Sequence, residues 1–397
     1  MFIEQGVHPE NKFWKYIIGS LVIILASTLG QIPLIVAVFI KSLSEGKNIP
    51  TNTEDLMKVF DSNLTLFLIL FSFVFALTSI YYVVRYFHNQ SFISITTSRD
   101  KVDWNRILFS FSIWTFFTIA STVGFYFFSP ESFVLNFKPI PFLILVVIAI
   151  VMIPIQTSTE EYVFRGYLMQ GFGIGTLNKK FVIGILYTIL FALVFYLLES
   201  LLFFKDISEF INQIISISLS ISFIFFIDFF LTKVNFFESS FYSKLYNKSK
   251  TKFVPLFITS IIFGSMHLFN PEVEKLGYII MVYYVGTGFL LGIMTLMDEG
   301  MELSLGFHAA NNLIGALLVT ADWSVFQTNS ILKDISEPSA GFDVILPVII
   351  IYPLLLYIFS KKYNWTNWTE KLTGKIEYSN IKLINTINEI NHDTNLS

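Results

Sequence analysis

Residues 141–166 read PFLILVVIAIVMIPIQTSTEEYVFRG, an apolar run (141–158) followed closely by Glu160, Glu161 and Arg165. A run of about 20 apolar residues can cross the roughly 30 Å hydrocarbon core of a bilayer as an α-helix. Inside hydrocarbon the backbone can form hydrogen bonds only with itself, so such a run must be helical. The stretch therefore predicts a membrane helix that carries charged side chains next to its apolar part.

Apolar runs of similar length recur along almost the whole chain. We interpret ten of them as membrane helices: 16–40, 63–84, 107–128, 141–158, 181–204, 211–232, 253–269, 278–297, 304–320 and 344–360. The alternation of apolar and polar residues that marks a transmembrane β-barrel is absent from the sequence. The fold class we predict is all-α, a polytopic transmembrane bundle of about ten helices.

The composition agrees with a membrane protein. Of the 397 residues, 54% are hydrophobic and only 14% are charged, whereas a soluble domain carries about 25% charged residues. The net charge of −3 provides no strong field for a polyanion. The chain has no cysteine, which excludes disulfides, thiolate metal sites and a cysteine nucleophile. We expect the lipid bilayer as a partner and no nucleic acid.

The distribution of lysine and arginine between the loops predicts the orientation in the membrane. With the N-terminus in the cytoplasm, 19 of the 26 basic residues fall in inner segments. The outer segments hold the remaining seven: Lys41, Lys47, Lys58, Lys138, Lys205, Lys275 and Lys333. Because cytoplasmic loops carry the excess of positive charge, we expect both termini in the cytoplasm. The localisation we predict is multi-pass in the cell membrane, the inner or plasma membrane of a bacterium.

The charged cluster behind the quoted run is the first candidate for chemistry. If the helix continues through it, Glu161 and Arg165 lie four residues apart on one face, a spacing that suits an ion pair. Glu160 points about 100° away and has no local cation. A carboxylate without a partner in a dry site suits a general base. The alternative is a charged helix end at the cytoplasmic interface.

Two of the five histidines, His267 and His308, lie within membrane segments. A single membrane histidine more often bonds a neighbouring helix than a ligand. Asn312 lies one turn beyond His308 on the same face, so both could donate to one oxygen, as an oxyanion site requires. With Glu160 taking a proton from water and His267 holding that water, the set matches a hydrolase. Glu160, His267 and His308 could equally hold a divalent metal such as zinc, although HExxH is absent.

The order EExxxR, FxxxH and HxxxN on membrane helices resembles the CPBP (Abi) family of intramembrane proteases, whose eukaryotic relative is the type II CAAX prenyl endopeptidase. The motifs are Glu160-Glu161 with Arg165, Phe263 with His267, and His308 with Asn312. The resemblance covers roughly residues 140–320 and implies a membrane endopeptidase, although bacterial members also include bacteriocin-immunity and processing proteins. The roles it implies are Glu160 as base, Glu161 and Arg165 as its support, His267 at the water, and His308 with Asn312 at the oxyanion.

We divide the chain into four parts. They are an N-terminal membrane region with three helices (1–139), a protease-like core (140–320), a last outer loop and helix (321–360), and a polar cytoplasmic tail (361–397). Glu160 and His267 are 107 positions apart, more than the family usually has, and a two-helix insert at about 181–252 accounts for the excess. The insert either enlarges the lipid-facing surface or gates the substrate.

The sequence places Glu160 and His267 at different depths in the membrane, although both are expected to reach the same water molecule. Glu160 follows the inner end of its run, whereas His267 lies about 14 residues beyond Lys252, or roughly 20 Å deep at 1.5 Å per residue. Either the seventh helix starts later, near Pro255, or the fourth helix is bent at Pro154 and set deeper. We expect a water-filled funnel, open to the cytoplasm, that accommodates both groups.

The function we predict is hydrolysis of a peptide bond in a membrane-associated peptide or protein by a glutamate-activated water, with or without a metal. One alternative is a non-catalytic immunity or scaffold protein that keeps the pocket. Another is a proton-coupled transporter, which should have repeat symmetry that the sequence lacks. The CAAX specificity belongs to prenylated eukaryotic proteins and does not transfer to this chain.

Overall fold

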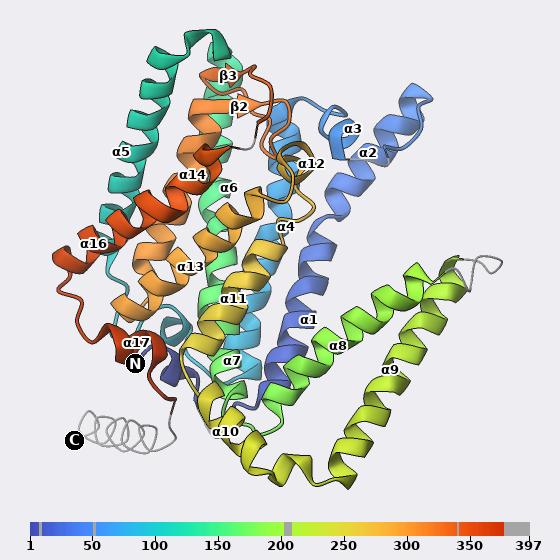
Figure 1. Ribbon diagram of the computed structural model, residues 1–397. Coiled ribbons are helices and arrows are strands. Elements are labelled where there is room, and N and C mark those ends of the chain that lie inside the picture. The colour runs from blue at the N-terminus through green and yellow to red at the C-terminus, as the bar shows by residue number, and fades with distance from the viewer. Residues whose placement is uncertain (8–9, 51–52, 202–208, 340, 377–397) are drawn as a thin grey trace.

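The computed structural model describes residues 1–7, 10–50, 53–201, 209–339 and 341–376. The end of the predicted tail, 377–397, lies outside the described residues. Within them, the fold is a bundle of long helices with three short strands at one end (Figure 1). The predicted all-α, polytopic class is confirmed.

The long helices run up and down the bundle. They are α1 (Phe13–Gly30), α2 (Ile32–Glu45), α4 (Ser62–Tyr82), α5 (Trp104–Phe128), α6 (Pro139–Glu161), α8 (Phe181–Ser200), α9 (Glu209–Lys233), α11 (Phe253–Ser265), α13 (Ile280–Asp298), α14 (Glu302–Leu318) and α16 (Tyr352–Lys362). Among the described residues, eight helical segments are long and apolar enough to cross a membrane. The two remaining predicted runs form α11 and α14, which have 13 and 17 residues.

Short elements gather at the two ends of the bundle (Figure 1). One end, which we call the basic end, carries the N-terminus, α10 (Ser240–Ser249) and α17 (Trp368–Thr373). The other, the sheet end, carries α3 (Thr53–Met57), α12 (Pro271–Leu276) and the strands β1 (Phe133–Leu135), β2 (Val319–Ala321) and β3 (Leu332–Asp334). Strand β3 lies in the middle, antiparallel to β1 and parallel to β2. The predicted inner loops lie at the basic end.

The fourth membrane helix does not end at the glutamates. After α6 the chain continues without a break through a π-helical segment, η5 (Tyr162–Leu168), into α7 (Met169–Gly175). Another 14 residues, or about 20 Å of helix, therefore separate Glu161 from the end of α7. The prediction that Glu160 lies at the inner end of its helix was wrong. The depth conflict disappears because this helix is set deeper, while α11 starts at Phe253 without delay.

Two glycines of α13 bring α11 close to it. A Cβ atom built on Gly288 would lie 2.8 Å from the Ser260 carbonyl oxygen, and one on Gly292 would lie 2.4 Å from Leu256 Cδ1. Both neighbours belong to α11, so a side chain at Gly288 would meet its backbone and one at Gly292 would displace the Leu256 side chain. Small residues four apart permit such close packing of membrane helices. This contact fixes where the end of α11, with His267, lies against α13.

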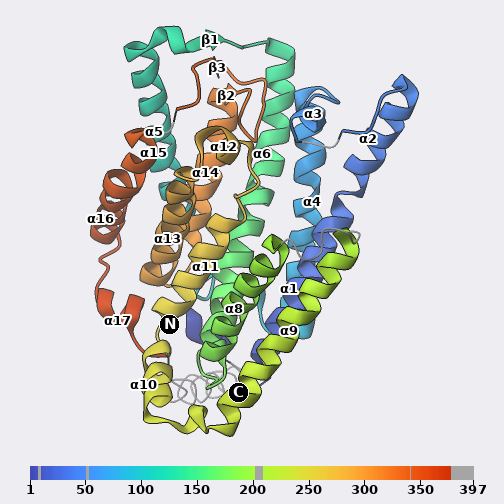
Figure 2. The ribbon, with the colours of Figure 1, turned by 45° about the vertical axis from the view of Figure 1, so that its right-hand side comes forward.

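The predicted insert forms a helical hairpin. In Figure 1 its two helices, α8 and α9, diverge from the rest of the bundle and rejoin it at the basic end. Both are long and apolar enough to cross a membrane. Within the hairpin, the Tyr187 hydroxyl donates to Asp228 at 3.0 Å. Two crossings return the chain to the basic end through α10, so α11 starts from that end (Figure 2).

A buried histidine at the basic end predicts how stability depends on pH. His88 Nδ1 lies 2.8 Å from Asn11 Oδ1 and Nε2 lies 2.9 Å from the Tyr167 hydroxyl. Burial, helped by the nearby charge of Lys15, lowers the pKa of His88 to about 4. The unfolded chain, with a histidine pKa of about 6.5, therefore takes up a proton first.

We expect this group to cost folding stability as the pH falls from about 6.5 to about 4, by up to about 3 kcal/mol. Melting temperatures of the detergent-purified protein between pH 8 and pH 4 measure this loss. In His88→Gln the loss over that window should be smaller. Equal pH dependence in the two proteins would contradict the assignment to His88.

Candidate active site

Glu161 and Arg165 form a buried ion pair at the centre of the bundle. Arg165 Nη1 lies 3.0 Å from Glu161 Oε1, and the two side chains are 1% and 0% exposed. The predicted pairing is thereby confirmed. Arg165 also donates from Nη2 to the Gly288 carbonyl at 3.3 Å, and its guanidinium lies 4.1 Å from the centroid of the Phe263 ring. Three helices are thus tied together through one arginine, because Phe263 belongs to α11 and Gly288 to α13.

Glu160 points to another side of the same helix. Gln156, one turn earlier, donates from Nε2 to Glu160 Oε1. The other oxygen, Oε2, is buried and has no hydrogen-bond partner among the described residues. The side chain keeps 17% of its surface exposed. A carboxylate with one uncommitted oxygen at the edge of a buried site can accept a proton from a water molecule.

His308 lies between the two carboxylates. Its Nδ1 is 2.7 Å from Glu161 Oε1 and its Nε2 is 3.5 Å from Glu160 Oε2. Because an ionised carboxylate can only accept, Nδ1 carries the proton that is donated to Glu161. The pair of Glu161 and Arg165 therefore fixes the orientation of the imidazole and leaves Nε2 facing Glu160. The sequence does not predict this bridge, since the residues are 147 positions apart.

His267 lies just beyond the end of α11 and is half-buried. Its Nδ1 donates to the Phe263 carbonyl at 2.8 Å, which leaves Nε2 as the acceptor of the neutral ring. The ring stacks on Tyr284 of α13, with centroids 4.3 Å apart. Phe263 touches both imidazoles, with centroid distances of 5.0 Å to His267 and 5.9 Å to His308.

Asn312 extends the polar cluster toward the sheet end. Its Nδ2 donates to Gln156 Oε1 at 3.0 Å, and its Oδ1 accepts from Asn311 Nδ2 at 3.0 Å. Asn311 Oδ1 in turn accepts from the Trp114 indole at 3.1 Å. The sequence analysis missed Gln156, Asn311 and Trp114. Gln156 could have been identified as a candidate site residue from the sequence, because it is a polar residue inside an apolar run, one turn before Glu160.

The donors do not form a metal site as they are arranged. Among the described residues, no group of three or more His, Asp or Glu side chains lies in an arrangement that could hold a metal ion. Nδ1 of His267 is occupied by a backbone carbonyl, and both ring nitrogens of His308 face carboxylates. The zinc alternative for Glu160, His267 and His308 remains a prediction.

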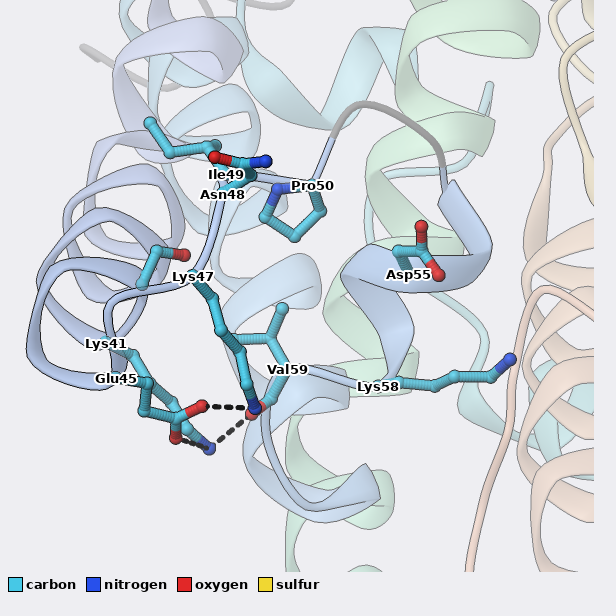
Figure 3. Close-up of a pocket in the computed structure, with 10 residues that line it drawn as sticks. Lys41, Glu45, Lys47, Asn48, Ile49, Pro50, Asp55, Lys58 and Val59 are labelled. Carbon is cyan, nitrogen blue, oxygen red and sulfur yellow. Dashed lines mark hydrogen bonds and ion pairs between the residues drawn. The ribbon is translucent and has the colours of Figure 1, made fainter.

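A separate hollow of about 550 Å³ lies between α2 and α3 (Figure 3). Three of its charged residues interact with one another, since Lys47 donates to Glu45 at 2.7 Å and Lys41 lies 3.8 Å from the same carboxylate. It is formed by elements other than those that carry Glu160, His267 and His308. We therefore assign it no part in the candidate active site.

Comparisons with known proteins bear on the same residues. Residues 235–314 match the family model described as "Type II CAAX prenyl endopeptidase Rce1-like". The matched segment contains His267, His308 and Asn312, whereas Glu160 and Glu161 precede it. The protein YyaK of Bacillus subtilis (strain 168), described as uncharacterized, is 24% identical over 328 residues, which are 81% of this chain and 83% of YyaK. No solved structure matches the chain.

The matched segment contains part of the candidate active site. The matched residues run from before α10 into α14, and they include His308, which lies between the two glutamates of α6. Among the described residues, the eight helical segments that are long and apolar enough to cross a membrane also indicate a multi-pass membrane protein. Over residues 235–314 the chain is therefore similar to the type II CAAX prenyl endopeptidase Rce1-like family.

Proposed function

We propose that this protein is an intramembrane endopeptidase of the bacterial cell membrane that hydrolyses a peptide bond by a water molecule activated by Glu160. The observation that carries the proposal is the arrangement around Glu160. One of its oxygens is buried without a partner, and His308, oriented by the buried ion pair of Glu161 and Arg165, lies 3.5 Å from it. A structural salt bridge alone would not need a second carboxylate with an uncommitted oxygen.

In the proposed mechanism Glu160 removes a proton from water, and the water oxygen attacks the carbonyl carbon of the peptide bond. His267 Nε2 accepts a hydrogen bond from that water and orients it. The carbonyl oxygen becomes an oxyanion, which needs donors that are already in place. Nε2 of His308, when protonated, and the Asn312 amide are the candidates for these donors.

The tetrahedral intermediate then collapses. Its C–N bond breaks, and the proton held by Glu160 passes to the leaving nitrogen, so that a free amine and a carboxylate result. Glu161 and Arg165 touch no reacting atom in this scheme. Their role is to hold His308 in one tautomer and one orientation, as a buried carboxylate does for a catalytic histidine.

Terminal proteomics of membranes from cells that express the wild-type protein or Glu160→Gln tests the proposal. We expect a set of new protein N-termini that requires Glu160 and survives in the control Glu131→Gln, an exposed glutamate outside the site. If no N-terminus depends on Glu160 while the variant retains the cellular phenotype, the scaffold alternative is favoured and the protease proposal fails. Loss of the same termini after chelation would favour the metal-assisted variant.

A further inference from the structure

The helices that carry the site are buried on one side of it and partly exposed on the other. On α14 every residue from 302 to 308 is buried, whereas Asn311, Asn312 and Gly315 farther along the helix are half-exposed. On α13 the same change occurs, because all residues from 280 to 286 are at least partly exposed and most of those from 287 to 298 are buried. The exposed half of each helix lies toward the sheet end (Figure 1).

A layer of ion pairs seals the side toward the basic end. Asp298 and Glu302, both almost fully buried, pair with Arg99 at 3.1 and 3.2 Å. Arg106 also pairs with Asp298, and the Trp365 indole donates to it at 3.0 Å. Glu302 is six residues before His308, about 9 Å along the helix. A funnel from the basic end, as expected from the sequence, would have to pass through this layer.

A vestibule adjoins the accessible side. It is a hollow of about 750 Å³ at the sheet end, lined by parts of the segments 268–278 and 322–327 together with Met57. The first of these segments starts directly after His267. Asn270, in its wall, lies 3.5 Å from the Tyr284 hydroxyl, and Tyr284 stacks on His267. Asn270 and Tyr284 thus connect the wall of the vestibule to the candidate catalytic histidine.

The lining of the vestibule fits a peptide segment. Phe269 and Tyr278 are 91% and 79% exposed, and Trp323 lines the same hollow. The Trp323 Nε1 donor is buried and has no hydrogen-bond partner among the described residues. Aromatic surface with a few polar groups is typical of sites that bind peptides and small ligands. Asp322, in the same wall, is held by Lys333 at 2.7 Å.

We propose that the active site opens toward the sheet end, and that its substrates are peptide segments on the outer side of the membrane, which enter through this vestibule. The outer location follows from the charges, since only seven of the 26 basic residues lie in the predicted outer segments, and the six of these that the structure describes lie at the sheet end. The substrate class rests on the proposed endopeptidase function. The direction of opening does not, and can be measured without any substrate.

A single engineered thiol tests the direction of opening. Gly315 lies seven residues beyond His308 on the same stripe of α14, and a Cβ atom there would have nothing within 4 Å. Because the chain has no cysteine, Gly315→Cys provides one thiol. Glu337→Cys at the sheet end and Lys248→Cys at the basic end, both exposed, are the topology controls.

Intact cells and inside-out vesicles are treated with a membrane-impermeant trimethylammonium methanethiosulfonate, and the mass shift is measured. We expect Gly315→Cys and Glu337→Cys to react in intact cells and Lys248→Cys to react only in inside-out vesicles. Reaction of Gly315→Cys only in inside-out vesicles would overturn the proposal. So would its failure to react from either side, or an inverted result for the two controls.

The positions of the cleavage sites test the substrate class. We expect the N-termini that depend on Glu160 to map to outer segments of membrane or exported proteins. If such termini exist but map to cytoplasmic segments, this inference fails while the endopeptidase function stands. If none exists, the proposed function fails, and the thiol experiment still decides which way the site opens.

Discussion

Arg165→Met is expected to lower the free energy of unfolding by about 3–5 kcal/mol, because it leaves the Glu161 carboxylate buried without its cation. Neither side chain is more than 1% exposed, so water cannot replace the lost partner. The guanidinium also bonds the Gly288 carbonyl and lies over Phe263. Its removal therefore loosens the contacts of η5 with both α11 and α13.

The double variant Glu161→Gln/Arg165→Met separates charge from packing. We expect it to recover a large part of the lost stability, because removing both members of a buried pair costs much less than removing one. Melting temperatures in detergent compare the wild type, Arg165→Met and the double variant. As a control, Lys179→Met breaks an exposed pair with Glu238 and should change stability by less than about 1 kcal/mol. A double variant no more stable than Arg165→Met would show that charge burial is not the cause.

Glu160→Gln and His308→Asn are each expected to reduce kcat/KM by roughly 10²–10⁴-fold, the range for loss of a general acid or base. The side chains face each other, with His308 Nε2 3.5 Å from Glu160 Oε2. Residues that act as one unit give losses that are far from additive. The kcat/KM of the double variant should therefore be only slightly lower than that of the less active single variant.

Initial rates on a substrate found by terminal proteomics, with the protein in liposomes, measure this coupling. All variants should melt close to the wild type, since both changes keep the polarity of the site. Losses that multiply in the double variant would mean that Glu160 and His308 act independently. In that case the arrangement of His308 between the two carboxylates would have no catalytic meaning.

Local features of this protein could be predicted from its sequence. The lengths of the apolar runs predict the membrane helices, because within lipid a run of this kind can satisfy its backbone hydrogen bonds only as a helix. The four-residue spacing of Glu161 and Arg165 gave their ion pair, and the spacing of Gly288 and Gly292 is a feature of close helix packing. Each of these rests on neighbours within one helix.

Features that depend on tertiary contacts could not be predicted. The fourth helix continues past Glu160 because neighbouring helices, and not water, surround its charges. Hydropathy reports exposure to lipid, so a charged segment buried in protein looks like a helix end. The bridge from His308 to Glu161 requires α14 to lie against α6, which no local pattern specifies. The sequence predicts a funnel open to the cytoplasm, because no local pattern tells which half of α13 and α14 is covered by other helices.

The measurement that tests the account most directly is cleavage by purified protein in liposomes, compared between the wild type and Glu160→Gln. Circular dichroism and melting temperature establish that the variant is folded. The account predicts cleavage by the wild-type protein and a loss of at least about 100-fold in the variant. Undiminished cleavage by a well-folded Glu160→Gln protein would contradict it.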